Sequence, residues 1–517
     1  MAHRDVDGWG RKGFWKQKYT TDGYTVWGAP QVDETSCYPW GARYIYDVTG
    51  DIGFLEAHYD EVFEAGIAST CEFATPVFED GQWKKKSTTD ARLYYTETFN
   101  LTHSMSLWED AFGLFNYSNA SVIRALEDAA AIANILDQNA CPGGPGACNY
   151  HNDAALFTNR ANAVRTGLDD RLAWNGENCD ISQLGIAYPF DIYPANHPRT
   201  ALIADRINGV ANDTFGNNQP LVNFGGEWND LINRYHNDGY WNNPGAPNAA
   251  GSPWFLSTMW YGCYYAMRQD FNPGKSDIDN HRHRLDLLLD RLGPVGFGAE
   301  QISPSNSLLY AGQTDFLLQA AWPNAWESMS FFVDAMMLFF DYTPDADGNT
   351  LRIEPKLPTG WSTITCNNLH LGNHRISITA DESNATHRNT FTNHTGNALN
   401  FDTHIRVPAG SSVIAVTKNG AGGCNTLSFT HDAATGRVHV SGDIDAGVEA
   451  VTEIRVRFGL RGDFDAANGV DLTDLPVFVG VLLGDDSDCE HILIADMNAD
   501  GTADGEDVQG FTDAQVP

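Results

Sequence analysis

Apolar side chains recur with the period of an α-helix through the first two thirds of the chain. The clearest segments are residues 119–136, 153–174, 253–271 and 315–340. Several are apolar on nearly all sides, which is typical of helices buried on more than one face, as in the inner ring of a two-layered helical barrel. Long loops rich in Gly, Pro and Asn separate them. We therefore expect a helical domain over residues 1–345 whose loops carry the functional site.

The pattern changes to a period of two after residue 361. Short segments alternate apolar and polar side chains and are separated by Gly, Asn and Asp turns. They are residues 374–380, 400–408, 411–420, 436–442 and 450–458. This alternation predicts an antiparallel β-sandwich over residues 346–460, because each strand buries one face and exposes the other.

The charge excludes several classes of partner. The 517 residues include 32 Lys and Arg against 67 Asp and Glu, a formal net charge of −35. This field repels phosphate backbones and anionic membrane surfaces, so we expect no nucleic-acid partner. No stretch approaches the roughly 20 apolar residues that a membrane span needs. The 14 Trp and 19 Tyr suit a sugar substrate, whose C–H faces stack on aromatic rings.

The nine Cys include no CxxC pair, which argues against zinc and thioredoxin-type chemistry. Cys141 and Cys148 bracket the turn-forming sequence PGGPGA, which can bring the two sulfur atoms together. A disulfide there favours an oxidising compartment, whereas the alternative is two free thiols on a loop.

Residues 461–517 form a third, acidic domain with 14 Asp and Glu against one basic side chain, Arg461. Two of its segments have the ligand spacing of a calcium loop. The complete copy has Gly501 at the turn, and its ligands are Asp496, Asn498, Asp500, Thr502 through its backbone carbonyl, Asp504 and Asp507. The first copy keeps Asp463, Asp465, Asp471 and Asp474. It has Ala467 at the fifth position and Asn468 at the turn, so we expect it to bind Ca²⁺ more weakly.

The duplicated loops, each followed by a helix-like run, resemble dockerin-type modules over residues 461–512. The resemblance implies a small α-helical module with structural Ca²⁺. It also implies an extracellular or cell-surface protein with a cohesin-like or cell-surface partner.

A second resemblance lies in the order of several motifs within the helical region. The motifs are PQVDE (30–34), SLWEDAFG (106–113), RYHNDGYW (234–241), GSPWFLSTMW (251–260), AEQISPSN (299–306) and AAWPNAWESM (320–329). Their order and spacing over residues 25–342 are similar to the glucoamylase family, glycoside hydrolase family 15. This resemblance implies an (α/α)6 six-hairpin barrel with the site in loops at one end, and an enzyme that hydrolyses terminal α-linked sugar with inversion.

The resemblance also implies roles for individual residues. Glu109 matches the general acid and Glu300 the general base, and an inverting hydrolase needs such a pair roughly 6.5 to 9.5 Å apart. The residues that match sugar-binding or pocket-lining positions are Asp33, Trp108, Asp110, Arg234, Asp238, Trp254 and Trp322. No cofactor is implied for catalysis.

Ser106 and Asp110 depart from the family, which has Asp and Glu at these positions. Little helical sequence precedes PQVDE, so we expect a start that lacks the first barrel helix of the family. Two alternatives therefore stay open, a helical-barrel glycoside phosphorylase and a non-catalytic carbohydrate-binding surface protein. The cations of the run His281 to Arg284 are expected to lie on a solvated helix surface.

Overall fold

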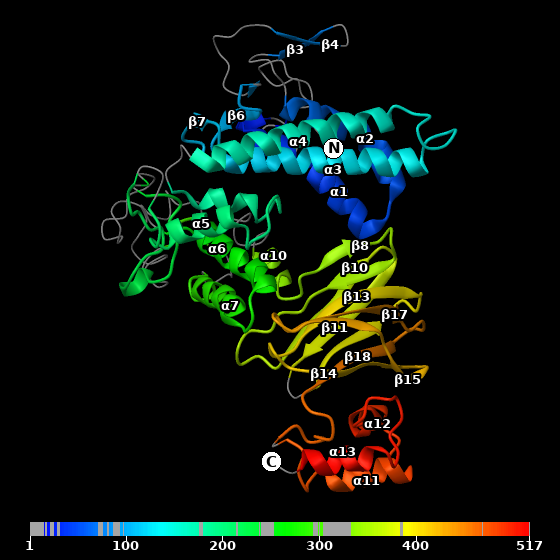
Figure 1. The fold of residues 1–517 in the computed structure, drawn as a ribbon. Coiled ribbons are helices and arrows are strands. Elements are labelled where there is room, and N and C mark those ends of the chain that lie inside the picture. The colour runs from blue at the N-terminus through cyan, green and yellow to red at the C-terminus, as the bar shows by residue number, and fades with distance from the viewer. Residues whose placement is uncertain are drawn as a thin grey trace. The chain divides into compact units, whose positions relative to one another are not determined.

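The fold is seen in a computed structural model (Figure 1). It describes residues 15, 18–20, 25–27, 31–70, 76–79, 82–85, 94–96, 98–174, 179–212, 216–236, 238, 253–292, 298, 300–302, 332–382, 386–467 and 469–515. The chain divides into two compact units. Unit 1 comprises residues 1–268 and 280–335, and unit 2 comprises residues 269–279 and 336–517.

Unit 1 is mainly helical. Its helices are α1 (Val32–Thr49), α2 (Ile52–Ser69), α3 (Asn116–Asn139), α4 (Tyr150–Trp174), α5 (Pro198–Ile207), α6 (Phe255–Arg268) and most of α7 (Ser276–Leu289) and α10 (Phe332–Met337), with short 3₁₀ helices η1 (Ile181–Ile186) and η2 (Gly226–Trp228). Its strands are β1 (Lys18–Tyr19), β2 (Thr25–Trp27), β3 (Pro76–Glu79), β4 (Gln82–Lys85), β5 (Tyr94–Thr96), β6 (Leu101–Met105) and β7 (Phe112–Gly113).

Helix α3 lies at the centre of the first helices and packs against α1, α2 and α4. Alanines such as Ala125, Ala129 and Ala133 are fully buried in α3, and their small side chains let neighbouring helices approach closely. Local signals set the helix ends: Gly50 ends α1 in the left-handed conformation at φ 68°, and the side chain of Asp51 caps Phe54 N at 3.1 Å. The helices expected at 119–136, 153–174 and 253–271 are therefore confirmed as α3, α4 and α6.

The run His281 to Arg284 corrects one expectation. His281 is fully buried, with Nε2 2.8 Å from the carbonyl oxygen of Ala335, and Arg284 is only 5% exposed. Gly262 of α6 makes this possible, because a Cβ there would lie 3.1 Å from the side chain of Arg284. His281 and Arg284 thus pack against α6, whereas Arg282 is partly exposed and His283 is exposed, as expected.

Unit 2 contains two sheets. One has the order β10-β11-β12-β18-β14-β15 and the other β16-β17-β13-β9-β8. The strands are β8 (Thr343–Asp345), β9 (Thr350–Ile353), β10 (Thr363–Leu371), β11 (His374–Asp381), β12 (Thr386–Asn393), β13 (Leu399–Arg406), β14 (Val413–Gly420), β15 (Gly423–Thr426), β16 (Phe429–Asp432), β17 (Arg437–Ile444) and β18 (Ala450–Phe458).

The two sheets pack face to face. Phe391 of β12 and Phe401 of β13 belong to different sheets, and their rings stack with centroids 5.6 Å apart. Burial alternates along β11, β12 and β13, as the period of two predicts. One pairing differs from the expected antiparallel arrangement: β13 pairs with β9 in parallel.

Unit 2 also includes the 3₁₀ turn η3 (Gln269–Phe271). After the sheets, the chain forms the short helices α11 (Leu475–Leu483), α12 (Cys489–Ala495) and α13 (Asp507–Ala514). Their core is formed by Phe478, Val481, Ala495 and Phe511, with the rings of Phe478 and Phe511 stacked at 4.0 Å. A disulfide between Cys424 of β15 and Cys489 of α12 ties these helices to the sandwich.

The structure forms the disulfide that the sequence predicts between Cys141 and Cys148, and the bond between Cys424 and Cys489 was not anticipated. Among the described residues, no helix has both the length and the hydropathy to cross a membrane. A helical domain followed by β-sheets is confirmed, whereas the closed (α/α)6 barrel stays a prediction.

Candidate active site

The predicted acid Glu109 lies on a tight turn between two paired strands. Strands β6 and β7 pair with Met105 opposite Phe112. The turn is closed by Ser106 N donating to Ala111 O at 2.7 Å and Glu109 N donating to Ser106 O at 3.0 Å. Glu109 has φ 63°, in the left-handed region, which costs a residue with a Cβ of order 1–3 kcal/mol and persists only where its surroundings hold it.

The start of α1 provides part of that support. Gln31 Nε2 donates to the carbonyl oxygens of Ser106 at 2.7 Å and Leu107 at 3.2 Å, and Val32 N donates to Ser104 Oγ at 3.1 Å. These bonds fix the turn against the first residues of α1. Asp33, one residue further on, is thereby brought within electrostatic reach of Glu109.

Asp33 is a buried carboxyl, 7% exposed. Burial raises its pKa to about 7, and the neighbouring charge of Glu109 acts in the same direction. Its Oδ1 has no hydrogen-bond partner among the residues that the structure describes. A buried carboxyl oxygen without a partner is suited to bind a hydroxyl group of a ligand.

Trp108 precedes Glu109, and its indole points to a residue that the motifs did not indicate. Trp108 Nε1 lies 3.0 and 2.9 Å from the two carboxyl oxygens of Asp180. Asp180 precedes η1 and also accepts from Ser182 N at 2.7 Å. Burial raises the pKa of Asp180 to about 6. The only signal in the sequence is the pattern Asp-x-Ser before a turn, which is common at helix starts.

Arg234 and Asp238 form a buried ion pair beside Trp108. Arg234 Nε and Nη2 donate to Asp238 Oδ2 and Oδ1 at 2.7 and 2.6 Å. The guanidinium carbon lies 5.1 Å from the ring centroid of Trp108 and 4.2 Å from that of Trp254. These distances allow cation–π attraction, so the cation is stabilised both by a carboxylate and by two rings.

Asp110 is exposed and is held in place by two hydroxyl groups. Ser106 Oγ and Tyr235 OH lie 2.6 Å from its two oxygens. The two positions that differ from the glucoamylase motif, Ser106 and Asp110, therefore bond to each other. Tyr235, like Gln31 and Asp180, was not predicted from the sequence.

Glu300 adjoins this group through the backbone. Trp254 and Gln301 form an isolated β-bridge, and Phe255 N donates to Glu300 O at 3.4 Å. The structure thus gathers Asp33, Trp108, Glu109, Asp110, Arg234, Asp238 and Trp254 into one connected set, with Glu300 next to Trp254. Trp322 lies outside the described residues.

The two predicted calcium loops share the hydrogen bonds of their last Asp, offset by 33 residues. Asp474 accepts from the backbone N–H groups of Phe464, Asp465 and Asp471, and Asp507 accepts from those of Met497, Asn498 and Asp504. Ala466 and Ala499 both have positive φ, at 58° and 62°. The sequence repeat is therefore also a repeat of structure.

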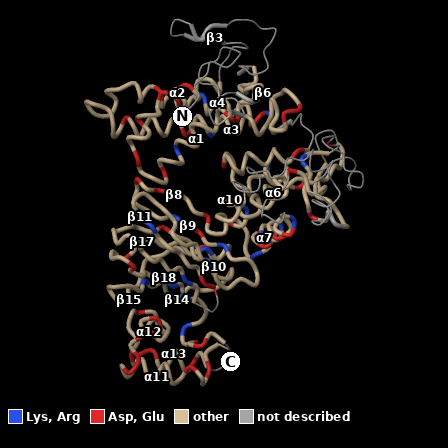
Figure 2. Tube along the Cα trace, turned by 180° about the vertical axis from the view of Figure 1, so that it is seen from behind, with Lys and Arg blue, Asp and Glu red and all other residues tan. Residues whose placement is uncertain are grey.

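The donor chemistry of these loops fits Ca²⁺, which prefers carboxylate and carbonyl oxygen. In the first loop, Asp463, Asp465 and Asp474 each offer an oxygen within 4.8 Å of the others. Figure 2 shows acidic positions along this part of the chain. The residues therefore fit the ion that the resemblance implies, and its binding stays a prediction.

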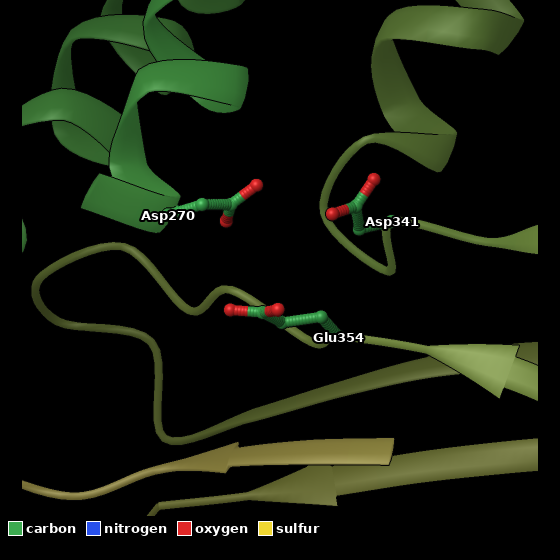
Figure 3. A group of neighbouring side chains, drawn as sticks. All are labelled: Asp270, Asp341 and Glu354. Carbon is green, nitrogen blue, oxygen red and sulfur yellow. The ribbon is translucent and has the colours of Figure 1, made fainter. Parts of the chain in front are cut away.

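A second acidic group lies in unit 2, where Asp270, Asp341 and Glu354 converge from η3, the turn after α10 and the end of β9 (Figure 3). Cations already neutralise it. Fully buried Lys356 lies 2.7 Å from Asp270 and 3.0 Å from Asp341, and Arg406 lies 3.0 Å from Asp270 and 2.6 Å from Glu354.

Arg437 contacts Glu354 from β17 as a third cation of this group. Opposing charge lowers the pKa of Glu354 to about 2, against the effect of burial, and the carboxylates raise the pKa of Lys356. Three carboxylates thus face three cations. A metal ion would be repelled by Lys356 and the two guanidinium groups, so we interpret the cluster as a structural ion network.

No family model matches this chain. The chain is 22% identical over 259 residues to an uncharacterized glycosyl hydrolase of Methanocaldococcus jannaschii, over 49% of this chain and 34% of the relative. It therefore spans about a third of the length of that relative.

Solved structures are also similar to this chain. An α-L-rhamnosidase of Streptomyces avermitilis, in complex with L-rhamnose, is 13% identical with a TM-score of 0.45, over 88% of this chain and 35% of that chain. A glucoamylase of Hormoconis resinae is 13% identical with a TM-score of 0.40, over 84% of this chain and 73% of that chain.

Proposed function

We propose that this protein is an exo-acting, inverting α-glycosidase of glucoamylase type that releases terminal glucose from α-glucan or oligosaccharide. The observation that carries the proposal is the guanidinium of Arg234, held by Asp238 and lying 5.1 Å and 4.2 Å from the rings of Trp108 and Trp254, next to the turn of Glu109. The similarity to a glycosyl hydrolase of M. jannaschii supports glycoside hydrolysis.

In the proposed reaction, Glu109 donates a proton to the glycosidic oxygen as the bond to the anomeric carbon breaks. Glu300 accepts a proton from the water molecule that attacks the anomeric carbon from the opposite face. The released sugar then carries the inverted anomeric configuration. Asp33, with its raised pKa and unpartnered Oδ1 among the described residues, would bind a hydroxyl group of the terminal sugar.

The test is hydrolysis by the purified chain of maltose, isomaltose, trehalose, starch and dextran, with the anomer followed by NMR. We expect β-glucose as the first product. Glu109→Gln and Glu300→Gln should each lower kcat by about 10² to 10⁴-fold or more, since each removes a proton-transfer group. The exposed Glu56→Gln on α2 is the matched control and should keep full activity.

The same assay separates the alternatives. Turnover that requires phosphate would indicate a phosphorylase, and sugar binding without turnover would indicate a carbohydrate-binding surface protein. From starch or dextran, whose leaving group is the shortened glucan, release of the terminal glucose as the α-anomer would contradict the inverting mechanism. Normal turnover in Glu109→Gln or Glu300→Gln would remove that residue from the reaction.

We also propose that α11 to α13 form a dockerin-like module with structural Ca²⁺, on an extracellular or cell-surface protein. Two disulfides support an oxidising location. An exposed apolar row at helical spacing, Leu472, Leu475, Val479 and Leu483, would bind a cohesin-like domain. Val479→Asp should abolish binding to a purified cohesin domain without changing hydrolysis. Unchanged binding would exclude this surface.

A further inference from the structure

Asp180 occupies a central position among the residues of the candidate site, although no motif singled it out. Both of its carboxyl oxygens lie within 3.0 Å of Trp108 Nε1. The indole N–H is the only polar group of Trp108, so this contact is the only hydrogen bond that can fix its ring orientation. Trp108 is followed directly by Glu109 in the chain.

The backbone around Asp180 is joined to the other half of the site. Asp180 forms an antiparallel β-bridge with Tyr235, and Ile181 N donates to Arg234 O at 2.9 Å. The position of η1 is itself fixed by packing, because a Cβ on Gly185 would lie 2.6 Å from the ring of Tyr117 on α3. Asp180 therefore contacts both the turn of Glu109, through Trp108, and the segment of Arg234, through the bridge to Tyr235. Its own position is fixed because η1 packs closely against α3.

We propose that Asp180 is a positioning residue, which holds the indole of Trp108 and thereby the turn that carries Glu109 in the geometry needed for proton transfer to the substrate. The inference rests on the proposed function for its kinetic consequence. Its structural consequence, a fixed Trp108 ring, can be measured without catalysis.

Removal of the Asp180 carboxylate should displace Glu109, because the turn that carries Glu109 is strained and depends on its contacts. Glu109 has a left-handed backbone at φ 63°, and such a residue moves when its support is removed. The ring of Trp108 also lies against the guanidinium of Arg234 at 5.1 Å. A displacement of about 1 Å at a reacting group can cost about 10²-fold in rate.

The experiment is a double-mutant cycle between Asp180→Ala and Trp108→Phe in the full chain. We expect Asp180→Ala to lower kcat by about 10 to 10²-fold with little change in KM. In the Trp108→Phe background the same change should have almost no further effect, because the hydrogen bond is already absent. Asp180→Asn keeps one acceptor oxygen and should restore part of the activity. Additive losses in the two backgrounds would overturn the proposal.

The second measurement is the near-ultraviolet circular dichroism of the indole rings. Asp180→Ala should change the spectrum of the parent chain and leave that of Trp108→Phe unchanged. Trp108→Phe breaks the contact from the other side and leaves the cap of η1 intact, so it covers the case in which Asp180→Ala does not fold. If the parent hydrolyses no glycoside, the proposed function fails, and the spectra alone decide whether Asp180 fixes Trp108. Equal spectral changes in both backgrounds would overturn the positioning role.

Discussion

Arg234 and Asp238 form a two-bonded ion pair whose side chains are 4% and 0% exposed. Both charges are thus removed from water, and each depends on the other for stability. The pair is also four residues apart, as is the pair of Arg43 and Asp47, which is 28% and 22% exposed. The two pairs therefore provide a matched comparison of buried and half-exposed ion pairs.

We predict that Asp238→Asn lowers the free energy of unfolding by about 3–5 kcal/mol, because it breaks a buried ion pair by removing the charge of one partner. Asp47→Asn should cost less than about 1 kcal/mol. Urea unfolding followed by circular dichroism measures both. Equal losses of unfolding free energy in Asp238→Asn and Asp47→Asn would show that burial does not increase the contribution of the Arg234–Asp238 pair to stability.

The raised pKa of Asp33, about 7, predicts a stability that falls with rising pH. The unfolded carboxyl has a pKa of about 3.9, so between these values the folded chain binds a proton that the unfolded chain does not. The charge of Glu109 adds to this shift of the Asp33 pKa, and burial together with Asp33 raises the pKa of the Cys37 thiol.

Asp33→Asn should therefore be more stable than the parent at pH 8, by an amount on the order of a few kcal/mol that shrinks towards pH 4. Thermal unfolding of both chains at pH 5 and pH 8 measures the difference, and the comparison cancels the effects of other carboxylates. The prediction fails if the two melting temperatures keep a constant difference across this range.

The pKa of Glu354 is shifted in the opposite direction to that of Asp33, so its effect on stability also has the opposite dependence on pH. Its pKa is about 2 instead of 4.5, because Arg406, Arg437 and Lys356 surround it. Its stabilising contribution is present above pH 4.5 and is lost as the pH falls through about 2. At pH 7, Glu354→Gln should cost about 3–5 kcal/mol, since it removes the buried carboxylate that Arg406 and Arg437 share.

The control for Glu354 is Asp443→Asn in the same unit. Asp443 contacts Lys418 but is 73% exposed, and Lys418 keeps a second partner, Asp445, at 2.8 Å. We expect a loss below about 1 kcal/mol. A loss for Glu354→Gln no larger than that of the control would mean that the ion network contributes little to stability.

Calcium binding should be concentrated in the second loop. We predict that Asp496→Ala in the full chain removes most of the calorimetric heat of Ca²⁺ binding, whereas Asp463→Ala removes little, because Ala467 replaces a ligand in the first loop. Mg²⁺ should substitute poorly. No heat with Ca²⁺, or equal losses in both variants, would contradict the prediction.

The periodicity of apolar side chains predicted the strands well, because in a strand every second side chain faces the core. The alternation along β11, β13 and β18 is a direct record of which side chains face the core. The parallel pairing of β9 with β13 could not be predicted, because it joins segments about fifty residues apart and leaves no signal in either strand alone.

In the candidate site, too, the residues within local motifs could be predicted, whereas contacts between distant segments could not. Trp108 and Arg234 could be named from motifs, but the carboxylate that binds the indole could not, since Asp180 lies 72 residues from Trp108 and its sequence indicates only a turn. Gln31 was missed for a similar reason, because its contacts are with backbone carbonyls, which any sequence supplies. The burial of His281 was missed because its polarity suggested solvent.

The bond between Cys424 and Cys489 closes a covalent ring that contains residues 425–488. If the C-terminal end is tethered and the chain is pulled, tension passes from Cys489 directly to Cys424. The strands β16, β17 and β18, the loop from Asp463 to Asp474 and helix α11 all lie within the ring and are shielded from extension. Helix α13 and the loop from Asp496 to Asp507 lie outside it. Helix α13 and the second loop would therefore bear the pull directly, without the protection of the ring.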